Sequence, residues 1–453
     1  MSAGGVLTTA LSLAAALSCV PAAMLLLEVL AALVAMRRGG VGAARIDAID
    51  AGAGAGDGAE AMAGGRVPED GAGDGAPRAP VAILIPAHDE AGGIGATLAS
   101  VLAQLRDGDR LLVVADNCSD DTAAVARRAG AEVVERRDPE RRGKGYALDF
   151  GVRHLMATPP RAALRPDASA SDARGPGTPQ AVLIVDADCQ VAPGAVDALA
   201  RACLSTGRPA QACYLMHYPP AARTLGARIA EFAFVVKNRV RPLGLVTLGW
   251  PCPLLGSGMA FPLALIADAP LANGHLVEDM KLGVDLSARG QGPLYVPEAL
   301  VTSTFPSSEQ GQRTQRERWE HGHLQTIATH MPTLLLAGLR RGDRGAVALA
   351  FDLAIPPLAL LVMSTLAVGL VAAIAWLLGG AVLPMGLAAL ALAMLGAAVL
   401  LAWRAVAREL LPFSMLCRVP VYVLSKLPLY RSFIGARQTT WVRSRRDHEQ
   451  DPP

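Results

Sequence analysis

Hydrophobic and polar positions divide the chain into apolar terminal segments and a middle of short alternating patterns. No charged residue occurs from Met1 to Leu27, and the apolar run resumes after Glu28 and continues to Met36. About 20 consecutive apolar residues are enough to cross a bilayer. The pattern therefore predicts an N-terminal transmembrane anchor over residues 1–38. The alternative is a cleaved signal peptide, which would need the basic n-region that the opening MSAGG lacks.

A second apolar stretch lies toward the C-terminus. No residue between Asp352 and Arg404 is charged, and a glycine- and proline-containing turn falls near 377–386. An amphipathic helix of a soluble domain does not run this long without charges. We therefore predict a transmembrane hairpin over residues 345–404, which gives about two C-terminal spans.

The middle of the chain alternates between two kinds of segment. Short apolar runs typical of buried strands cover 81–86, 110–116, 131–136 and 181–188. Between them, helical spacing covers 93–105, 120–130 and 143–155. Alternation of strand and helix predicts an α/β fold with right-handed crossovers and a mainly parallel sheet covered on both faces. Ligands of such sheets bind at the carboxyl ends of the strands.

Three segments follow neither pattern. Residues 39–79 are mostly Gly, Ala and Asp and are expected to form a flexible linker. Residues 158–180 are expected to be a disordered surface insertion. Residues 405–453 mix apolar and basic residues with prolines and are predicted to be an interfacial segment followed by a basic cytosolic tail. Packing of that segment on the soluble domain is the alternative.

Basic residues indicate the orientation in the membrane. Arg37 and Arg38 follow the first apolar run, Arg340 and Arg341 precede the second, and Arg404 begins the basic residues after the third. The turn inside the hairpin has no basic residue. Because lysine and arginine collect on the cytoplasmic side, we expect a multi-pass protein of the inner (cell) membrane whose large middle segment is cytosolic.

Composition argues against several classes of protein. The 453 residues carry a net charge of +2, which gives no indication of nucleic-acid binding. The seven cysteines are scattered and form no C-x-x-C pair. This argues against a disulfide framework or a zinc knuckle and fits a reducing compartment.

Two carboxylates end the fourth predicted strand. Asp186 and Asp188, one residue apart, can point toward the same cation. Mg²⁺ prefers such oxygen ligands and commonly shares them with substrate phosphates. An ordinary loop after a strand is the alternative.

Other strand ends also carry polar side chains. Asp116 can accept hydrogen bonds from a ribose or a base, although Asn117 and its neighbours are equally good helix N-caps. Arg142 and Lys144 lie among glycines in RRGKG, where cations can meet a phosphate. The alternative interpretation of this segment is a solvent-exposed turn.

Two later motifs also contain candidate residues. Glu278 and Asp279 open a predicted helix, where one carboxylate can act as a general base with a pKa raised by the other. Gln315 and Arg318 share a helix face, while Trp319 is turned away by about 100°. Arginine suits a diphosphate and tryptophan a sugar ring. A simple helix start and an amphipathic helix with a core tryptophan are the respective alternatives.

The order of these motifs resembles that of a known family. ILIPAHDE, VVADNCSDDT, RGKGYALD, VDADC, GSGMAF, VEDMKLG and QRERW follow one another as in family-2 inverting glycosyltransferases. The resemblance covers about residues 81–326 and is closest to membrane-embedded, cellulose-synthase-like and ceramide-glucosyltransferase-like members. It implies a GT-A fold, a Rossmann-like nucleotide-sugar-binding domain, over residues 80–335.

The resemblance also implies roles for the matching positions. The nucleotide-sugar contacts fall on Pro86, His88, Glu90, Asp116, Lys144 and Asp186. A Mg²⁺ or Mn²⁺ cofactor is held by Asp186 and Asp188, and Asp279 is the catalytic base. The diphosphate and the acceptor meet Gln315, Arg318, Trp319, Gly258 and Glu278. Two positions depart from the family pattern, because Ala115 replaces an Asp and His88 replaces an Asn or Tyr.

The implied activity is transfer of a sugar, with inversion, from a UDP-sugar or similar donor. The acceptor is expected to be lipid-linked or a saccharide at the cytosolic membrane surface, with membrane lipid as the other partner and no nucleic acid. A processive polysaccharide synthase is the alternative within the family, and only three spans argue against it. A non-catalytic membrane-anchored nucleotide-binding regulator and a nucleotidyltransferase are alternatives of other classes.

Overall fold

A computed structural model describes residues 3–38, 78–158, 179–219, 223–272, 277–306, 308–416, 418 and 422. Nearly all of the predicted linker 39–79 and of the predicted insertion 158–180 lie outside the described residues, as does most of the predicted tail 405–453.

An eight-stranded sheet forms the centre of the molecule, with strand order β3-β2-β1-β4-β7-β6-β8-β5. Four neighbouring pairs run parallel, and β7 and β5 run antiparallel to their neighbours. The strands are β1 (Val81–Ala87), β2 (Arg110–Asp116), β3 (Glu132–Arg136), β4 (Ala181–Ile184), β5 (Gln190–Val191), β6 (Ala210–His217), β7 (Met259–Pro262) and β8 (Leu294–Thr304). The mainly parallel α/β fold predicted from the sequence is therefore confirmed.

Helices cover both faces of the sheet because successive side chains of a strand point to opposite sides. On β1, Ile83 and Ile85 pack in one core with α3 (Ile94–Leu102) and α6 (Ala195–Thr206). Leu84 packs in a second core with α5 (Lys144–Ala157) and α10 (Glu278–Ala288). The helices α4 (Thr122–Arg128) and α9 (Leu263–Ala267) complete the domain.

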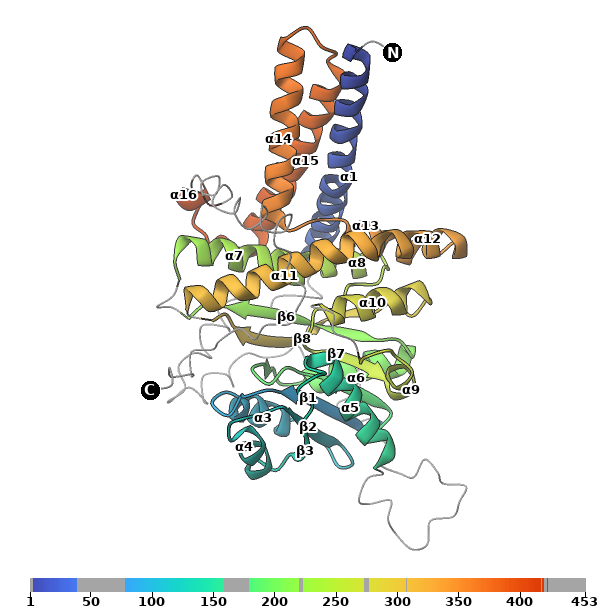
Figure 1. Ribbon diagram of the computed structural model, residues 1–453, viewed down its shortest axis with the longest axis vertical. Helices are drawn as coiled ribbons and strands as arrows, with labels where there is room; N and C mark the ends of the chain where they lie inside the picture. The colour runs from blue at the N-terminus through green and yellow to red at the C-terminus, as the bar shows by residue number, and fades with distance from the viewer. Residues whose placement is uncertain are drawn as a thin grey trace, which may run out of the picture.

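Among the described residues, three helices are long and apolar enough to cross a membrane: α1 (Ala3–Arg37), α14 (Leu358–Leu377) and α15 (Leu383–Val406). They form a bundle at one end of the molecule (Figure 1). One N-terminal and two C-terminal helices were predicted, and this part of the fold prediction is confirmed. The predicted hairpin segment 345–404 also contains most of α13 (Arg344–Leu353), which is separate from α14.

A layer of helices separates this bundle from the sheet (Figure 1). It contains the continuous helical segment α7–η5–α8 and the C-terminal helices α11 to α13. Their bounds are α7 (Leu225–Val235), η5 (Val236–Val240, a π-helix), α8 (Arg241–Thr247), α11 (Glu309–Thr329) and α12 (Met331–Arg341), followed by α13. The short α16 (Phe413–Leu416) follows α15.

A buried ion cluster joins the bundle to this layer. Glu28, in the apolar run of α1, accepts a hydrogen bond from Arg241 Nε at 3.1 Å, and Arg241 Nη2 donates to the Asp352 carboxylate at 2.7 Å. All three side chains are buried. A Cβ added to Gly244 would lie 2.1 Å from the Glu28 carbonyl oxygen, so glycine permits α8 to cross α1 with backbone contact. Charged residues near the membrane persist where they are paired.

We expect Arg241→Met to destabilise the folded protein, because it leaves the Glu28 and Asp352 carboxylates buried without a cation. Breaking one partner out of a buried pair costs about 3–5 kcal/mol. Thermal unfolding of the detergent-purified full chain measures the effect. The matched control is Arg313→Met, because Arg313 is 77% exposed and pairs with Glu317 on the surface, where such pairs contribute about 0–1 kcal/mol. Equal shifts in the two variants would contradict a structural role for the cluster.

Candidate active site

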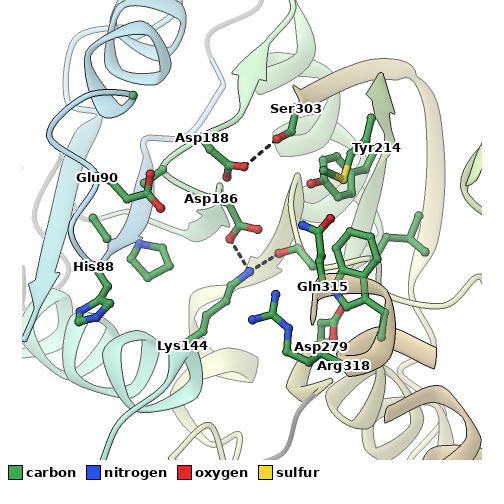
Figure 2. Close-up of a pocket in the computed structure, with 18 of the residues that line it drawn as sticks. His88, Glu90, Lys144, Asp186, Asp188, Tyr214, Asp279, Ser303, Gln315 and Arg318 are labelled. Carbon is green, nitrogen blue, oxygen red and sulfur yellow. Dashed lines mark hydrogen bonds and ion pairs between the residues drawn. The ribbon is translucent and has the colours of Figure 1, made fainter. Parts of the chain in front are cut away.

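A cavity of about 610 Å³ opens where the strands β1, β2 and β4 end, and α10, α11 and η5 complete its walls. It brings together residues that are far apart in the sequence (Figure 2). Of the predicted site residues, the following line it: Pro86, His88, Glu90, Asp116, Lys144, Asp186, Asp188, Glu278, Asp279, Gln315, Arg318 and Trp319. Gly258 is outside this lining.

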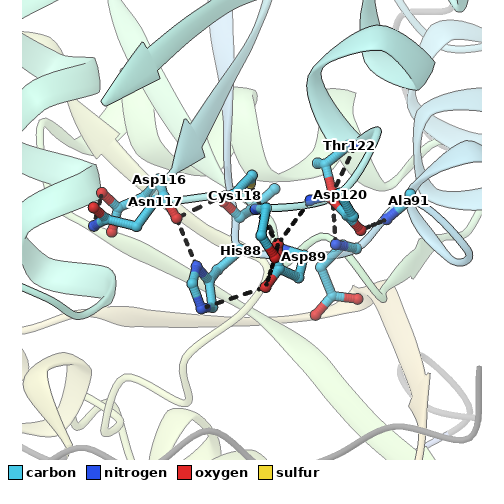
Figure 3. Close-up of polar contacts among 11 residues, drawn as sticks. His88, Asp89, Ala91, Asp116, Asn117, Cys118, Asp120 and Thr122 are labelled. Carbon is cyan, nitrogen blue, oxygen red and sulfur yellow. Dashed lines mark hydrogen bonds and ion pairs between the residues drawn. The ribbon is translucent and has the colours of Figure 1, made fainter. Parts of the chain in front are cut away.

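The loops after β1 and β2 hold each other in place at one end of the cavity (Figure 3). Asp89 and Asn117 both adopt the left-handed conformation, with φ of 52° and 53°, which Asp and Asn tolerate better than most residues. The Asp89 carboxylate accepts a hydrogen bond from the Ser119 backbone N–H at 2.6 Å, and Asp120 accepts one from Ala91 N–H at 3.0 Å.

This loop contact explains a second group of potential metal ligands. Oxygen and sulfur atoms of Asp89, Cys118 and Asp120 lie within 4.8 Å of one another. Backbone N–H groups already donate hydrogen bonds to both carboxylates. The role of Asp89 and Asp120 is therefore to hold the two loops together. The His88 ring joins it, with Nδ1 2.7 Å from the Asp116 carbonyl oxygen.

Asp116, the predicted nucleoside contact, has a protein partner that the sequence did not indicate. Arg136, at the end of β3, donates to its carboxylate at 2.7 Å, and both side chains are largely buried. Burial raises the pKa of Asp116 and Arg136 opposes that rise. Arg136 therefore fixes the carboxylate at the cavity wall.

The two aspartates of the D-x-D motif lie just past the end of β4, in the loop that leads to β5. The Asp186 carboxylate is bonded to the Lys144 ammonium group, which also donates to the Gly256 carbonyl at 2.6 Å. Asp188 accepts a hydrogen bond from Ser303 Oγ at 2.7 Å. Burial opposes the charge of Lys144, but Asp186 and Glu278 outweigh burial and raise its pKa.

These carboxylates suit a hard divalent cation. Ligand atoms of Asp186, Asp188 and Cys189 lie within 4.8 Å of one another. Burial, followed by the charge of Asp188, raises the pKa of the Cys189 thiol well above its usual value, and a neutral thiol is a poor ligand. Two carboxylates beside a cavity that admits a phosphate fit the oxygen coordination of Mg²⁺ or Mn²⁺.

Glu278 and Asp279 occupy the first turn of α10. Burial and the neighbouring Asp279 charge raise the pKa of Glu278 to about 7. The sequence analysis expected one of these two carboxylates to be a general base whose pKa is raised by its neighbour. The raised pKa belongs to Glu278, which is not the residue predicted as the base, and burial is its larger cause. Gly256, at φ of 96°, lies so close that an added Cβ would be 3.2 Å from Asp279 Oδ2.

Helix α11 contributes three predicted residues to one wall. Gln315 and Arg318 share one face of the helix. Trp319 leaves the helix in a different direction and also lines the cavity. Its ring lies 6.0 Å from that of Phe234. Gly258 has a packing role, because an added Cβ would be 2.7 Å from Ala212 Cβ and 2.8 Å from Val301 Cγ2.

Several lining residues were missed by the sequence analysis. The rings of Tyr214 and Phe305 lie 5.9 Å and 5.5 Å from that of Phe234, and together with Trp319 they make an aromatic wall. Lys237 lines the cavity beside them. Aromatic residues inside apolar runs are typical of core packing, so only the isolated lysine in the run EFAFVVKNRV offered a signal.

Comparison with known proteins gives one family match. The profile described as "Glycosyltransferase like family 2" matches residues 77–322, which is more than half of the chain. A mannosyltransferase from Pyrobaculum calidifontis, solved with GDP-Man and Mn²⁺, shares 18% identity over 93% of this chain and 100% of its own, with a TM-score of 0.45. Glucosyl-3-phosphoglycerate synthase from Mycobacterium tuberculosis, solved with Mn²⁺, uridine diphosphate and phosphoglyceric acid, shares 26% identity over 57% of this chain and 78% of its own, with a TM-score of 0.35. No curated protein matches the chain.

We expect Glu278→Gln to stabilise the metal-free protein at pH 8 and to have little effect at pH 5. The folded protein binds the Glu278 proton more tightly than the unfolded chain, since the pKa rises from 4.5 to about 7. Stability contributed by this group therefore falls as the pH rises through that window and stays low above it. Thermal unfolding in EDTA at both pH values measures the difference. A gain of the same size at pH 5 and pH 8 would contradict the raised pKa.

Proposed function

The chain belongs to glycosyltransferase family 2, whose members use nucleotide-sugar donors, and we propose that it transfers the sugar to a lipid-linked or saccharide acceptor at the cytosolic membrane surface, inverting the anomeric centre. This proposal rests on the presence of Asp186, Asp188 and Asp279 in the lining of one cavity. These residues come from two segments about ninety positions apart in the sequence.

The donor is proposed to lie along the ends of β1, β2 and β4. The base and ribose would meet Pro86, His88, Glu90 and Asp116, and the diphosphate would lie toward Lys144. Asp186 and Asp188 would hold Mg²⁺ or Mn²⁺. When bound, such a cation supplies positive charge that stabilises the negative charge of a leaving nucleoside diphosphate. UDP-sugars are the donors to test first.

The transfer needs a base that accepts the proton of the acceptor hydroxyl and positive charge that stabilises the departing diphosphate. Asp279 would take the proton of the acceptor hydroxyl as its oxygen attacks the anomeric carbon from the face opposite the diphosphate. The anomeric carbon–oxygen bond to the diphosphate breaks in the same step. Lys144 and Arg318 line the cavity, and their fixed charges would favour the departing diphosphate.

The acceptor is proposed to arrive from the membrane side. The layer that contains α11 lies between the sheet and the apolar bundle (Figure 1), and α11 forms one wall of the cavity. The basic residues that flank the spans favour a cytosolic catalytic domain. An amphiphilic acceptor fits this position and would make the chain similar to the ceramide-glucosyltransferase-like members.

A processive polysaccharide synthase, similar to the cellulose-synthase-like members, is the second candidate. The aromatic wall with Trp319 favours it, because aromatic faces suit successive sugar rings. Product length separates the two candidates, since single addition gives one product and processive synthesis gives a ladder.

We expect Asp279→Asn to lower turnover by about 10²- to 10⁴-fold, the contribution of a positioned general base. The amide keeps the size of the carboxylate but cannot accept the proton. Release of nucleoside diphosphate from UDP-sugars by purified full chain in lipid membranes, with Mn²⁺ or Mg²⁺, measures turnover.

Asp285→Asn is the matched control, because Asp285 lies on the same helix, pairs with Lys281 and is outside the cavity lining. It should remain close to wild type. Full turnover by Asp279→Asn would remove the assignment of the base.

A further inference from the structure

Lys237 lies at a distinctive place in the fold. It belongs to the π-helix η5, in the middle of the continuous helical segment α7–η5–α8. π-Helical turns are rare and often occur at functional sites. The same segment lines the cavity at Phe234, Lys237 and Asn238, and it docks on α1 through Arg241 and Gly244.

The ammonium group of Lys237 has charged neighbours but no close partner. Within the described part of the chain it makes no hydrogen bond and no ion pair, and its side chain is partly buried. Burial and the charge of Arg241 lower the pKa of Lys237, and the charge of Asp279 opposes them. A partly buried cation without a partner is costly, and an anionic ligand would supply the missing partner.

Asn238 provides a second and independent observation. Asn238 is among the residues that line the cavity and is only 3% exposed. The amide nitrogen donates to the Tyr214 carbonyl at 3.2 Å, which fixes the orientation of the amide. Its oxygen, Oδ1, is buried without a hydrogen-bond donor among the described residues. Buried acceptors normally have a partner, and a ligand hydroxyl would provide one.

Position assigns these two residues to the acceptor end of the cavity. The donor end already has a cation, Lys144, which is bonded to Asp186. Lys237 instead follows Phe234 on the same helical segment, and the Phe234 ring lies 6.0 Å from that of Trp319, a residue expected at the acceptor end. Arg241 of this segment joins the domain to α1. The α7–η5–α8 segment lies in the layer between sheet and bundle (Figure 1).

We propose that Lys237 and Asn238 form a subsite for an acceptor that carries both a hydroxyl and an oxyanion, either a phosphate or a carboxylate. Lys237 binds the oxyanion, and Asn238 Oδ1 accepts a hydrogen bond from a hydroxyl. This subsite rests on the proposed function, because it identifies the acceptor class of the same cavity. An anionic lipid headgroup and a soluble phosphate ester share this chemistry.

Amine acylation of Lys237, read by mass spectrometry on the full chain in nanodiscs, tests the subsite directly. One arm compares glycerol 3-phosphate with glycerol in phosphatidylcholine discs. The other compares phosphatidylglycerol discs with phosphatidylcholine discs containing diacylglycerol. Lys281, which is bonded to Asp285 and lies outside the cavity lining, is the internal reference for general shielding by lipid or protein.

We expect the anionic member of one pair to protect Lys237 severalfold, with Lys281 unchanged. Protection by phosphatidylglycerol identifies a lipid headgroup, and protection by glycerol 3-phosphate identifies a soluble ester. Equal protection by the neutral members, or no protection in either arm, overturns the subsite. Because acylation does not require turnover, its outcome is separate from the donor assay, in which absence of nucleoside diphosphate release overturns the proposed function.

A variant supplies the kinetic counterpart. In the arm that protects Lys237, Lys237→Met should lower kcat/KM for the anionic acceptor by about tenfold or more, consistent with loss of a charge-assisted hydrogen bond. Lys237→Arg should restore most of it, and Lys281→Met should match the wild type. An equal loss for anionic and neutral acceptors would instead mean that Lys237 acts on the Asp279 base.

Discussion

Four carboxylates gather at one edge of the sheet, and their mutual repulsion governs how the site is arranged. Asp186 and Asp188 come from the loop after β4, and Glu278 and Asp279 from the start of α10. This repulsion is relieved in two ways. Lys144 pairs with Asp186, and Glu278 has a pKa raised to about 7. We propose that a cation and the substrate, when bound, replace these arrangements.

Buried ion pairs connect the domain that contains this site to the apolar helix bundle. Glu28, Arg241 and Asp352 join a membrane helix, the α7–η5–α8 segment and α13 by buried ion pairs. The same segment presents Lys237 and Asn238 to the cavity. A continuous helical segment therefore links one wall of the cavity to the bundle. This arrangement gives a physical reason for an acceptor drawn from, or held at, the membrane surface.

The sequence predicts the first half of the domain well because the signals for its strands and helices lie within short stretches of the chain. Buried parallel strands such as β1 and β2 are continuous apolar runs, and polar residues at their ends identify the site edge. The mixed part of the sheet, β5 to β8, was not predicted, because its pairings join segments far apart in the chain. The same reason hides the Asp116–Arg136 pair. Gly258, expected near the acceptor, packs against Ala212 and Val301 instead, and only tertiary contacts reveal this.

We propose that Asp186 and Asp188 hold a cation together with a nucleoside diphosphate in this cavity. The decisive experiment is electron paramagnetic resonance of Mn²⁺ titrated into the purified full chain, with and without uridine diphosphate. We expect wild-type protein to bind Mn²⁺ more tightly when the nucleotide is present and Asp188→Asn to lose this binding. Unchanged Mn²⁺ binding by Asp188→Asn, or binding that does not depend on the nucleotide, would show that these residues do not form such a site.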